Sequence, residues 1–131
     1  MKILTVNTKQ RSEFIDITSK VEALVTNSKI NQGICIVFCP HTTAGLTINE
    51  NADPSVKSDI VSHLADLVPE NKGYEHIEGN SDSHIKSSLL GSSLNIIVEN
   101  NQLGLGTWQG IYFCEFDGPR TRKIYIKIIK E

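Results

Sequence analysis

The sequence predicts an α+β fold, a compact single domain over residues 1–131 with a mostly antiparallel sheet and two or three helices. The length lies in the range of one domain, about 100–200 residues. Strand-like segments outnumber helical ones. The segments near the C-terminus follow one another through short turns, which favours antiparallel pairing.

Seven segments have the β-branched or alternating apolar composition of strands. They are residues 3–6, 14–17, 34–39, 46–48, 94–99, 107–116 and 124–129. The segment 34–39 is apolar throughout, which predicts a central strand. In 124–129 every second residue is isoleucine, which predicts one buried face.

Helix signals occur at three places along the chain. Ser19 and Glu22 have the spacing of a capping box and predict a short helix. Asp53 followed by Pro54 predicts the start of a second helix, with Asp53 as its N-cap. A short third helix is expected to end at Gly91.

The composition argues against several classes of function. The chain has 13 basic and 15 acidic residues and a net charge of −2, whereas electrostatic binding of nucleic acid needs a basic excess. No apolar run approaches the ~20 residues that span a bilayer, and the polar N-terminus does not resemble a signal peptide. We therefore expect a cytoplasmic protein with reduced cysteines and with neither a nucleic-acid nor a membrane partner.

The first candidate functional residues follow two predicted strands. His41, Thr42 and Thr43 come directly after the apolar strand. Imidazole binds metal or moves a proton, and hydroxyls bind phosphate oxygens. Asn49 and Glu50 precede a predicted helix start, where free N–H groups attract anions. The carboxylate of Glu50 could orient a histidine or ligate a cation. The alternative for His41 is an ordinary loop histidine that is held in place by its neighbours.

Further candidates lie in the loops of the second half of the chain. Together with His41, His76 and His84 could supply three imidazoles to one divalent ion, although their spacing is not a short zinc signature. Trp108, the only tryptophan, follows a glycine-rich stretch and is either a pocket wall or a core residue. Arg120 ends a turn and is either a phosphate clamp or a solvated arginine.

Six stretches of the chain are similar to those of one known family. They are His41 to Pro54, Glu78–Gly79–Asn80, His84–Ile85–Lys86, Ser88–Leu89–Leu90–Gly91, Leu105 to Tyr112, and Glu115 to Arg120. On these residues the chain resembles the YjbQ-like family, also called the secondary thiamine-phosphate synthase family. The resemblance covers nearly the whole chain.

The resemblance implies a homotrimer and a weak thiamine-phosphate synthase activity. That reaction joins hydroxymethylpyrimidine diphosphate to thiazole phosphate and releases pyrophosphate. The implied catalytic residues are His41, His84 and Glu50. A small phosphorylated metabolite would be bound by Thr42, Thr43, Asn49, Lys86, Trp108 and Arg120. A divalent metal would be bound by His41, His76 and His84.

Two alternatives to the synthase stay open at this point. One is a metal-dependent hydrolase of an unknown phosphorylated substrate, and the other is a non-catalytic trimeric protein that binds a metal or a metabolite. Three histidines suit zinc or another transition metal, whereas magnesium, which remains possible, prefers carboxylate and phosphate oxygens. In a trimer we expect the site between subunits, with His41 from one chain and Arg120 from the next.

Overall fold

The computed structural model describes residues 1–131 and confirms the predicted α+β class. In chain order the elements are β1 (Lys2–Asn7), β2 (Glu13–Asp16), α1 (Thr18–Ser28), β3 (Gly33–Phe38), β4 (Ala44–Glu50), α2 (Pro54–Leu67), α3 (Ser81–Leu90), β5 (Ser93–Glu99), β6 (Gln102–Leu103), β7 (Gln109–Glu115) and β8 (Thr121–Lys130). Every strand pair is antiparallel. The short β6 is the one strand that the sequence pattern did not predict.

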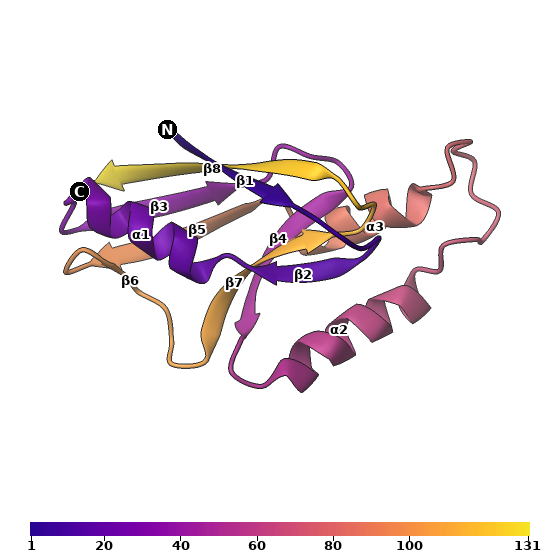
Figure 1. Cartoon of the computed structure of the whole chain (residues 1–131), viewed down its shortest axis with the longest axis horizontal. Coiled ribbons are helices and arrows are strands. Elements are labelled where there is room, and N and C mark those ends of the chain that lie inside the picture. Colours follow the sequence, from indigo (N-terminus) through magenta and orange to yellow (C-terminus); the bar gives the residue numbers. More distant parts are fainter.

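Two sheets face each other across the main core (Figure 1). The five-stranded sheet has the order β1-β8-β3-β5-β6, and the three-stranded sheet has the order β2-β7-β4. Val37 and Ile126 from the first sheet, Phe113 from the second and Val25 from α1 are all buried in this core. β3 lies at the centre of its sheet, as its apolar sequence predicts. Cys35 and Val37 on its inward face are buried, whereas Ile34 and Phe38 on its outward face are exposed.

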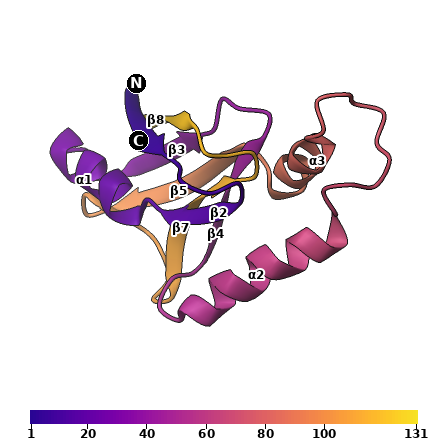
Figure 2. The ribbon, with the colours of Figure 1, turned by 45° about the vertical axis from the view of Figure 1, so that its right-hand side comes forward.

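A second, smaller core covers the other face of the three-stranded sheet. Phe14, Tyr112 and Phe116 pack there with one another and against α2 and α3. Figure 2 shows both helices on this side of the molecule, away from α1. The molecule therefore has three layers, and the outer face of the five-stranded sheet carries no helix.

The helix starts differ in part from those that the sequence predicts. Asp53 caps α2 as predicted, because its carboxylate accepts a hydrogen bond from the Ser55 backbone N–H at 2.9 Å. The predicted capping box is wrong. α1 begins at Thr18, and the carboxylate of Glu22 accepts from the Leu103 backbone N–H at 3.0 Å instead of reaching back to Ser19. The side chain of Glu22, on which the local motif depends, is therefore bound to a residue that is distant in the sequence.

Three segments meet at one end of the two sheets and shape a common surface. They are the β3–β4 loop at residues 39–43, the β7–β8 turn at residues 116–120, and the start of α3. The backbone N–H of Phe116 donates to the Thr43 carbonyl at 3.2 Å, and the hydroxyl of Ser83 donates to the Phe116 carbonyl. These bonds hold the three segments together. Separately, none of the helices is long and apolar enough to cross a membrane.

Candidate functional site

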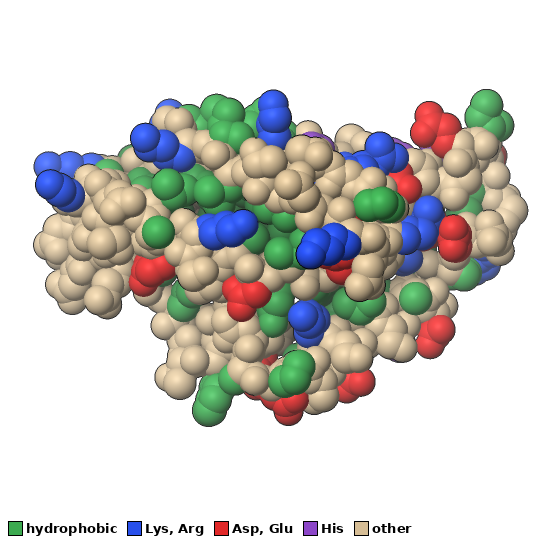
Figure 3. Space-filling view, viewed as in Figure 1, with side chains coloured by type: hydrophobic (Ala, Val, Ile, Leu, Met, Phe, Trp, Pro, Cys, Tyr) green, Lys and Arg blue, Asp and Glu red, His purple; other side chains and the backbone are tan.

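The junction of these three segments contains a polar cavity of about 460 Å³. No hydrophobic side chain lines it. The lining residues are Pro40, His41, Thr42, Thr43, His76, Glu78, Asn80, His84, Asp117, Arg120 and Arg122. Histidine atoms reach the surface beside lysine or arginine atoms between the β3–β4 loop and α3 (Figure 3). Two further hollows adjoin the cavity, and His84 lines all three.

His41 is held against the backbone of β8. Its Nε2 lies 3.0 Å from the backbone nitrogen of Lys123 and 3.1 Å from the carbonyl oxygen of the same residue. Partial burial, followed by the positive charge of Arg122, lowers the pKa of the imidazole below its usual value. His41 is therefore neutral at pH 7, with Nε2 occupied by the backbone and Nδ1 left for a ligand.

His76 and His84 approach each other from different elements. His84 belongs to the first turn of α3, and His76 comes from the long segment that leads to this helix. Their ring centroids are 5.4 Å apart, with the ring planes at 89°. Glu78 lies nearby, with its Oε2 3.8 Å from Nε2 of His76. This corner of the cavity is thus lined by two imidazoles and one exposed carboxylate.

A buried ion pair forms the floor of the cavity. The carboxylate of Glu115 is fully buried and accepts hydrogen bonds from Nε and Nη2 of Arg122, from the Thr8 hydroxyl, and from the backbone N–H groups of Phe116 and Asp117. Burial alone would raise the pKa of Glu115, but these hydrogen bonds and the charge of Arg122 lower it below its usual value. The Arg122 guanidinium is therefore rigidly oriented.

A second arginine is anchored on the opposite wall. Nη2 of Arg120 donates to Oδ2 of Asp117 at 3.0 Å, and Nε donates to the Asp117 carbonyl at 2.8 Å. Burial opposes ionisation of Asp117, yet the hydrogen bonds from Asn80 and Arg120 lower its pKa below the usual value. Arg11 approaches Asp117 from behind, with Nη1 3.5 Å from Oδ1. Arg120 therefore has a defined direction although it is exposed.

Both arginines keep one terminal nitrogen free. Nη1 of Arg120 and Nη1 of Arg122 donate to no group within the chain, whereas Nε and Nη2 of each are bound to an acid or a carbonyl. The hydroxyl of Thr43 accepts from Nη2 of Arg122 at 2.9 Å, and Thr42 is exposed at the rim. The cavity therefore presents guanidinium donors already fixed in place, an arrangement suited to phosphate oxygens.

Asn80 carries the one buried side-chain polar atom that has no partner. Its Nδ2 donates to Oδ2 of Asp117 at 2.9 Å, which fixes the orientation of the amide, and its Oδ1 accepts nothing. Asn80 is also the N-cap residue of α3, yet its side chain makes no capping bond. A buried acceptor without a donor is costly, so this position favours a bound water, a ligand donor or a cation.

The structure brings together only some of the residues that the sequence suggests. His41, His76, His84 and Arg120 line one cavity, together with Thr42 and Thr43. His41 and Arg120 do so within a single chain, so a second subunit is not needed to bring them together.

Asn49, Glu50 and Trp108 lie outside the cavity, at the other end of the three-stranded sheet. Glu50 pairs with Gln109 in β4–β7, whereas Ala44 pairs with Glu115 at the cavity end. Six residues of extended strand separate the two ends by roughly 20 Å. Lys86 lies outside the cavity for a different reason. Its Nζ turns inward to Asp82 at 3.1 Å and does not line the cavity.

Five residues of the cavity were not among the candidates suggested by the sequence: Pro40, Glu78, Asn80, Asp117 and Arg122. Asn80 and Asp117 belong to stretches on which the family resemblance depends, so that resemblance was the available signal. Arg122 begins a strand of alternating pattern, and nothing local to it distinguishes a buried arginine from a solvated one.

Comparison with known proteins identifies a family to which nearly the whole chain is similar. A family model described as UPF0047 protein YjbQ-like matches residues 2–131. The chain belongs to the YjbQ/UPF0047 family. The UPF0047 protein YugU of Bacillus subtilis is 54% identical over 130 residues, which cover 98% of each chain. A UPF0047 protein of Methanocaldococcus jannaschii is 55% identical over 124 residues, 95% of this chain and 90% of its own.

Solved YjbQ/UPF0047 structures have the same fold. A family member from Clostridium acetobutylicum is 55% identical and superposes with a TM-score of 0.96, covering 98% of this chain and 100% of its own. A YjbQ-like protein from Sulfolobus solfataricus is 33% identical, with a TM-score of 0.95, covering 99% and 96%. The fold of the family is thus retained while two thirds of the residues differ.

Proposed function

We propose that this YjbQ-family chain binds a small phosphorylated metabolite in the polar cavity and catalyses a transfer of the thiamine-phosphate synthase type. One observation carries the proposal. Arg120 and Arg122 are each anchored through two nitrogens, leave Nη1 without a partner in the chain, and line a cavity without hydrophobic lining. The family resemblance supports the choice of a diphosphate substrate.

The proposed reaction breaks the bond between a methylene carbon and a diphosphate oxygen. The thiazole ring nitrogen forms a new bond to that carbon and becomes positively charged, and the electron pair of the broken bond leaves with pyrophosphate. Donors held in place before the reaction stabilise the charge that develops on the leaving group. Arg120 and Arg122 are suited to that role, and Thr42 and His84 are placed to hydrogen bond to phosphate oxygens.

The first test compares histidine and arginine variants in an assay of thiamine-phosphate formation. We expect Arg120→Gln and His84→Ala to lower kcat/KM by about 100-fold, the usual cost of removing a donor to developing charge. His63→Ala is the matched control, since His63 is the fourth histidine and lies exposed on α2, away from the cavity. Undiminished product formation by both cavity variants would contradict the assignment.

Pyrophosphate binding distinguishes the synthase from a non-catalytic metabolite-binding protein. Titration calorimetry with pyrophosphate is expected to show binding that Arg120→Gln weakens. If wild-type protein binds pyrophosphate tightly but forms no product, the non-catalytic alternative replaces the transferase. If the wild-type protein binds no pyrophosphate, the transferase and the non-catalytic metabolite-binding protein are both wrong as functions of the cavity.

A metal site at His76 and His84 is the second candidate, and the contact between these two rings favours it. The fit inside one chain is incomplete, because no three histidine, cysteine or acidic side chains are grouped as metal ligands. His41 lines the same cavity but is not grouped with His76 and His84 as a metal ligand. A bound transition metal would supply an activated water for hydrolysis, and phosphate oxygens of the substrate would have to complete its shell.

Elemental analysis tests the metal candidate directly. Protein purified without added metal is compared with His84→Ala and with the control His63→Ala. If the site binds a metal, one transition-metal ion per chain is lost in His84→Ala and retained in His63→Ala. Wild-type protein without a stoichiometric metal would leave the histidines as phosphate-binding or proton-transfer groups.

Self-association is part of the proposal, because the resemblance implies a homotrimer. The outer face of the five-stranded sheet supports it. Ile34, Phe38 and Ile97 are exposed there by 47%, 40% and 62%, and Tyr125 stacks on Phe38 at 6.3 Å between ring centroids. A cluster of exposed apolar side chains on one face suits contact with further copies. A cytoplasmic location, which three buried free cysteines favour, completes the proposal.

A further inference from the structure

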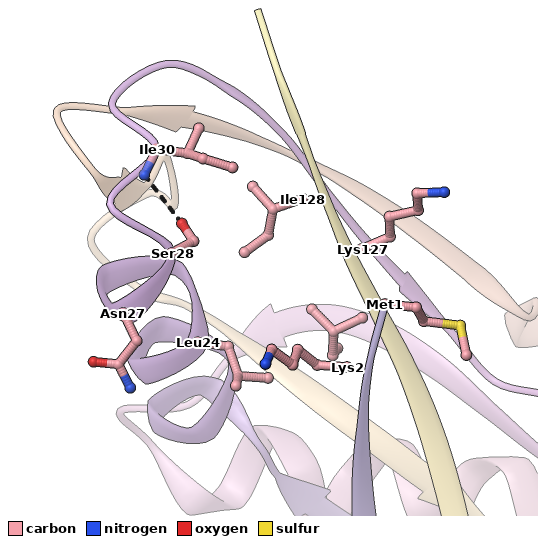
Figure 4. Close-up of a pocket in the computed structure, with 9 residues that line it drawn as sticks. Met1, Lys2, Leu24, Asn27, Ser28, Ile30, Lys127 and Ile128 are labelled. Carbon is pink, nitrogen blue, oxygen red and sulfur yellow. Dashed lines mark hydrogen bonds between the residues drawn. The ribbon is translucent and has the colours of Figure 1, made fainter.

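A second cavity, of about 370 Å³, opens between α1, β1 and β8 (Figure 4). Five of its nine lining residues are hydrophobic. The lining consists of Met1, Lys2, Leu24, Asn27, Ser28, Ile30, Ile126, Lys127 and Ile128. It shares no residue with the polar cavity. Along β8 it lies four to six residues from Arg122, a separation of roughly 13–20 Å.

The cavity exists because β8 continues past the point where β1 begins, so the last part of β8 has no β1 residue beside it. The register pairs Lys2 with Ile126, so no paired residue of β1 lies beside Ile128. On its other side Ile128 pairs with Cys35 of β3. On its inward side Ile128 faces α1 and the following loop, from which Leu24 and Ile30 line the cavity with it (Figure 4).

The rim of this cavity is positively charged. No acidic residue lines it, although the chain as a whole has a net charge of −2. Lys2 lies two residues before Leu4, so it shares the core-facing side of β1, and its side chain extends toward Leu24 (Figure 4). Lys2 forms no ion pair within the chain. Lys127 also lines the cavity, but its side chain points away from Leu24 and Ile128 (Figure 4).

An apolar wall beneath an unpaired cation has a definite chemical preference. A polyphosphate would find no cluster of donors and would lie against Leu24 and Ile128. A neutral hydrocarbon would use the apolar wall but would gain nothing from the exposed Lys2 ammonium. A molecule with one carboxylate and an apolar chain satisfies both parts, because the chain buries hydrocarbon while the carboxylate pairs with the ammonium. The volume lies within the range of small-molecule sites, about 300–1,000 Å³.

We propose that this cavity is a binding site for a small aliphatic monocarboxylate, separate from the polar cavity. The carboxylate pairs with Nζ of Lys2, and the hydrocarbon chain packs on Leu24, Ile126 and Ile128. Asn27 and Ser28 also line the cavity.

Octanoate, octanol and octylammonium are the probes that test the proposal. Each is titrated into isotope-labelled protein with an untagged N-terminus, and amide shifts are followed by NMR. We expect octanoate to shift the amides of residues 24–30 and 126–128. It should bind about three- to fivefold more tightly than octanol, the factor expected of a partly solvated ion pair, and octylammonium should bind most weakly.

Two variants separate the role of the charge from that of the cavity. Lys2→Met keeps the length of the side chain and is expected to equalise the affinities for octanoate and octanol. Leu24→Trp fills the cavity and is expected to abolish the binding of both octanoate and octanol. Thermal unfolding checks that the variant is folded. Equal affinity of wild-type protein for octanoate and octanol, or shifts that miss residues 126–128, would overturn the proposal.

Discussion

At the residue scale, the geometry of the polar cavity depends on the buried pair of Glu115 and Arg122. The pair connects the β7–β8 turn to the β3–β4 loop, because Nη2 of Arg122 also donates to the Thr43 hydroxyl at 2.9 Å. All the donors around Glu115 come from within the chain. Loss of the charge on Glu115 would leave Arg122 buried without its counter-ion, a change that costs far more than the pair contributes.

Glu115→Gln is therefore expected to lower the free energy of unfolding by about 3–5 kcal/mol at pH 7, measured by urea denaturation. Glu75→Gln, at an exposed glutamate, is the control and should change little. A smaller loss of unfolding free energy together with loss of pyrophosphate binding would still agree with this role of Glu115, since glutamine keeps the volume of the side chain but not its charge. An unchanged unfolding free energy would contradict this account of the cavity floor.

The same pair predicts a pH dependence with a definite sign. The pKa of Glu115 is lower in the folded protein than its ordinary value of about 4.3 in an unfolded chain. A depressed folded pKa contributes stability that is complete above the unfolded value and is lost as the pH falls through the folded value. Denaturation between pH 7 and pH 3 should therefore show a smaller loss of stability in Glu115→Gln than in wild type.

At the element scale, the helices differ in how firmly they are attached. α1 buries Val21 and Val25 in the main core, whereas α2 has no buried residue over its 14 positions. α2 contacts the second core through Ile60, Val61 and Leu64, which are only partly buried. Elements with few buried apolar contacts open at lower free energy than the global transition.

Hydrogen exchange is expected to be faster in α2 than in α1. Leu64→Ala should accelerate exchange in α2 further while leaving β3 and β8 protected, because these strands belong to the main core. Val25→Ala is the comparison, since it should weaken protection throughout the molecule. Protection of α2 equal to that of α1 would show that α2 is held by contacts beyond those within one chain.

At the scale of the whole molecule, the outer face of the five-stranded sheet is an apolar surface without a partner in the chain. Ile34 lies between Ile97 and Ile129 across the strands, so these apolar side chains form one continuous surface. Figure 3 shows hydrophobic atoms gathered at the edge where β1 and β8 lie.

Sedimentation equilibrium tests the proposed trimer. Wild-type protein is expected at three times the chain mass of 14.5 kDa, and Phe38→Glu is expected to dissociate it by burying a charge in the interface. Ile77→Glu is the control, because Ile77 is 97% exposed but lies in the segment between α2 and α3. A wild-type monomer of 14.5 kDa would exclude the trimer.

The sequence by itself determined the fold class, the approximate positions of seven of the eight strands and the start of α2, because each depends on local periodicity or on a cap within three residues. It also singled out His41, His76, His84 and Arg120 by residue type and loop position. Only the tertiary structure decided which of them share a cavity. Ala44 and Glu50 begin and end one extended strand, so Thr43 lies at the cavity and Glu50 at the far end.

Long-range pairing also decided the residues that local patterns could not reveal. Arg122 is buried because β8 returns beside the β3–β4 loop, and Asn80 is fixed by Asp117, which is 37 residues away along the chain. Such partners are set by packing between segments distant in sequence, and no local pattern encodes them.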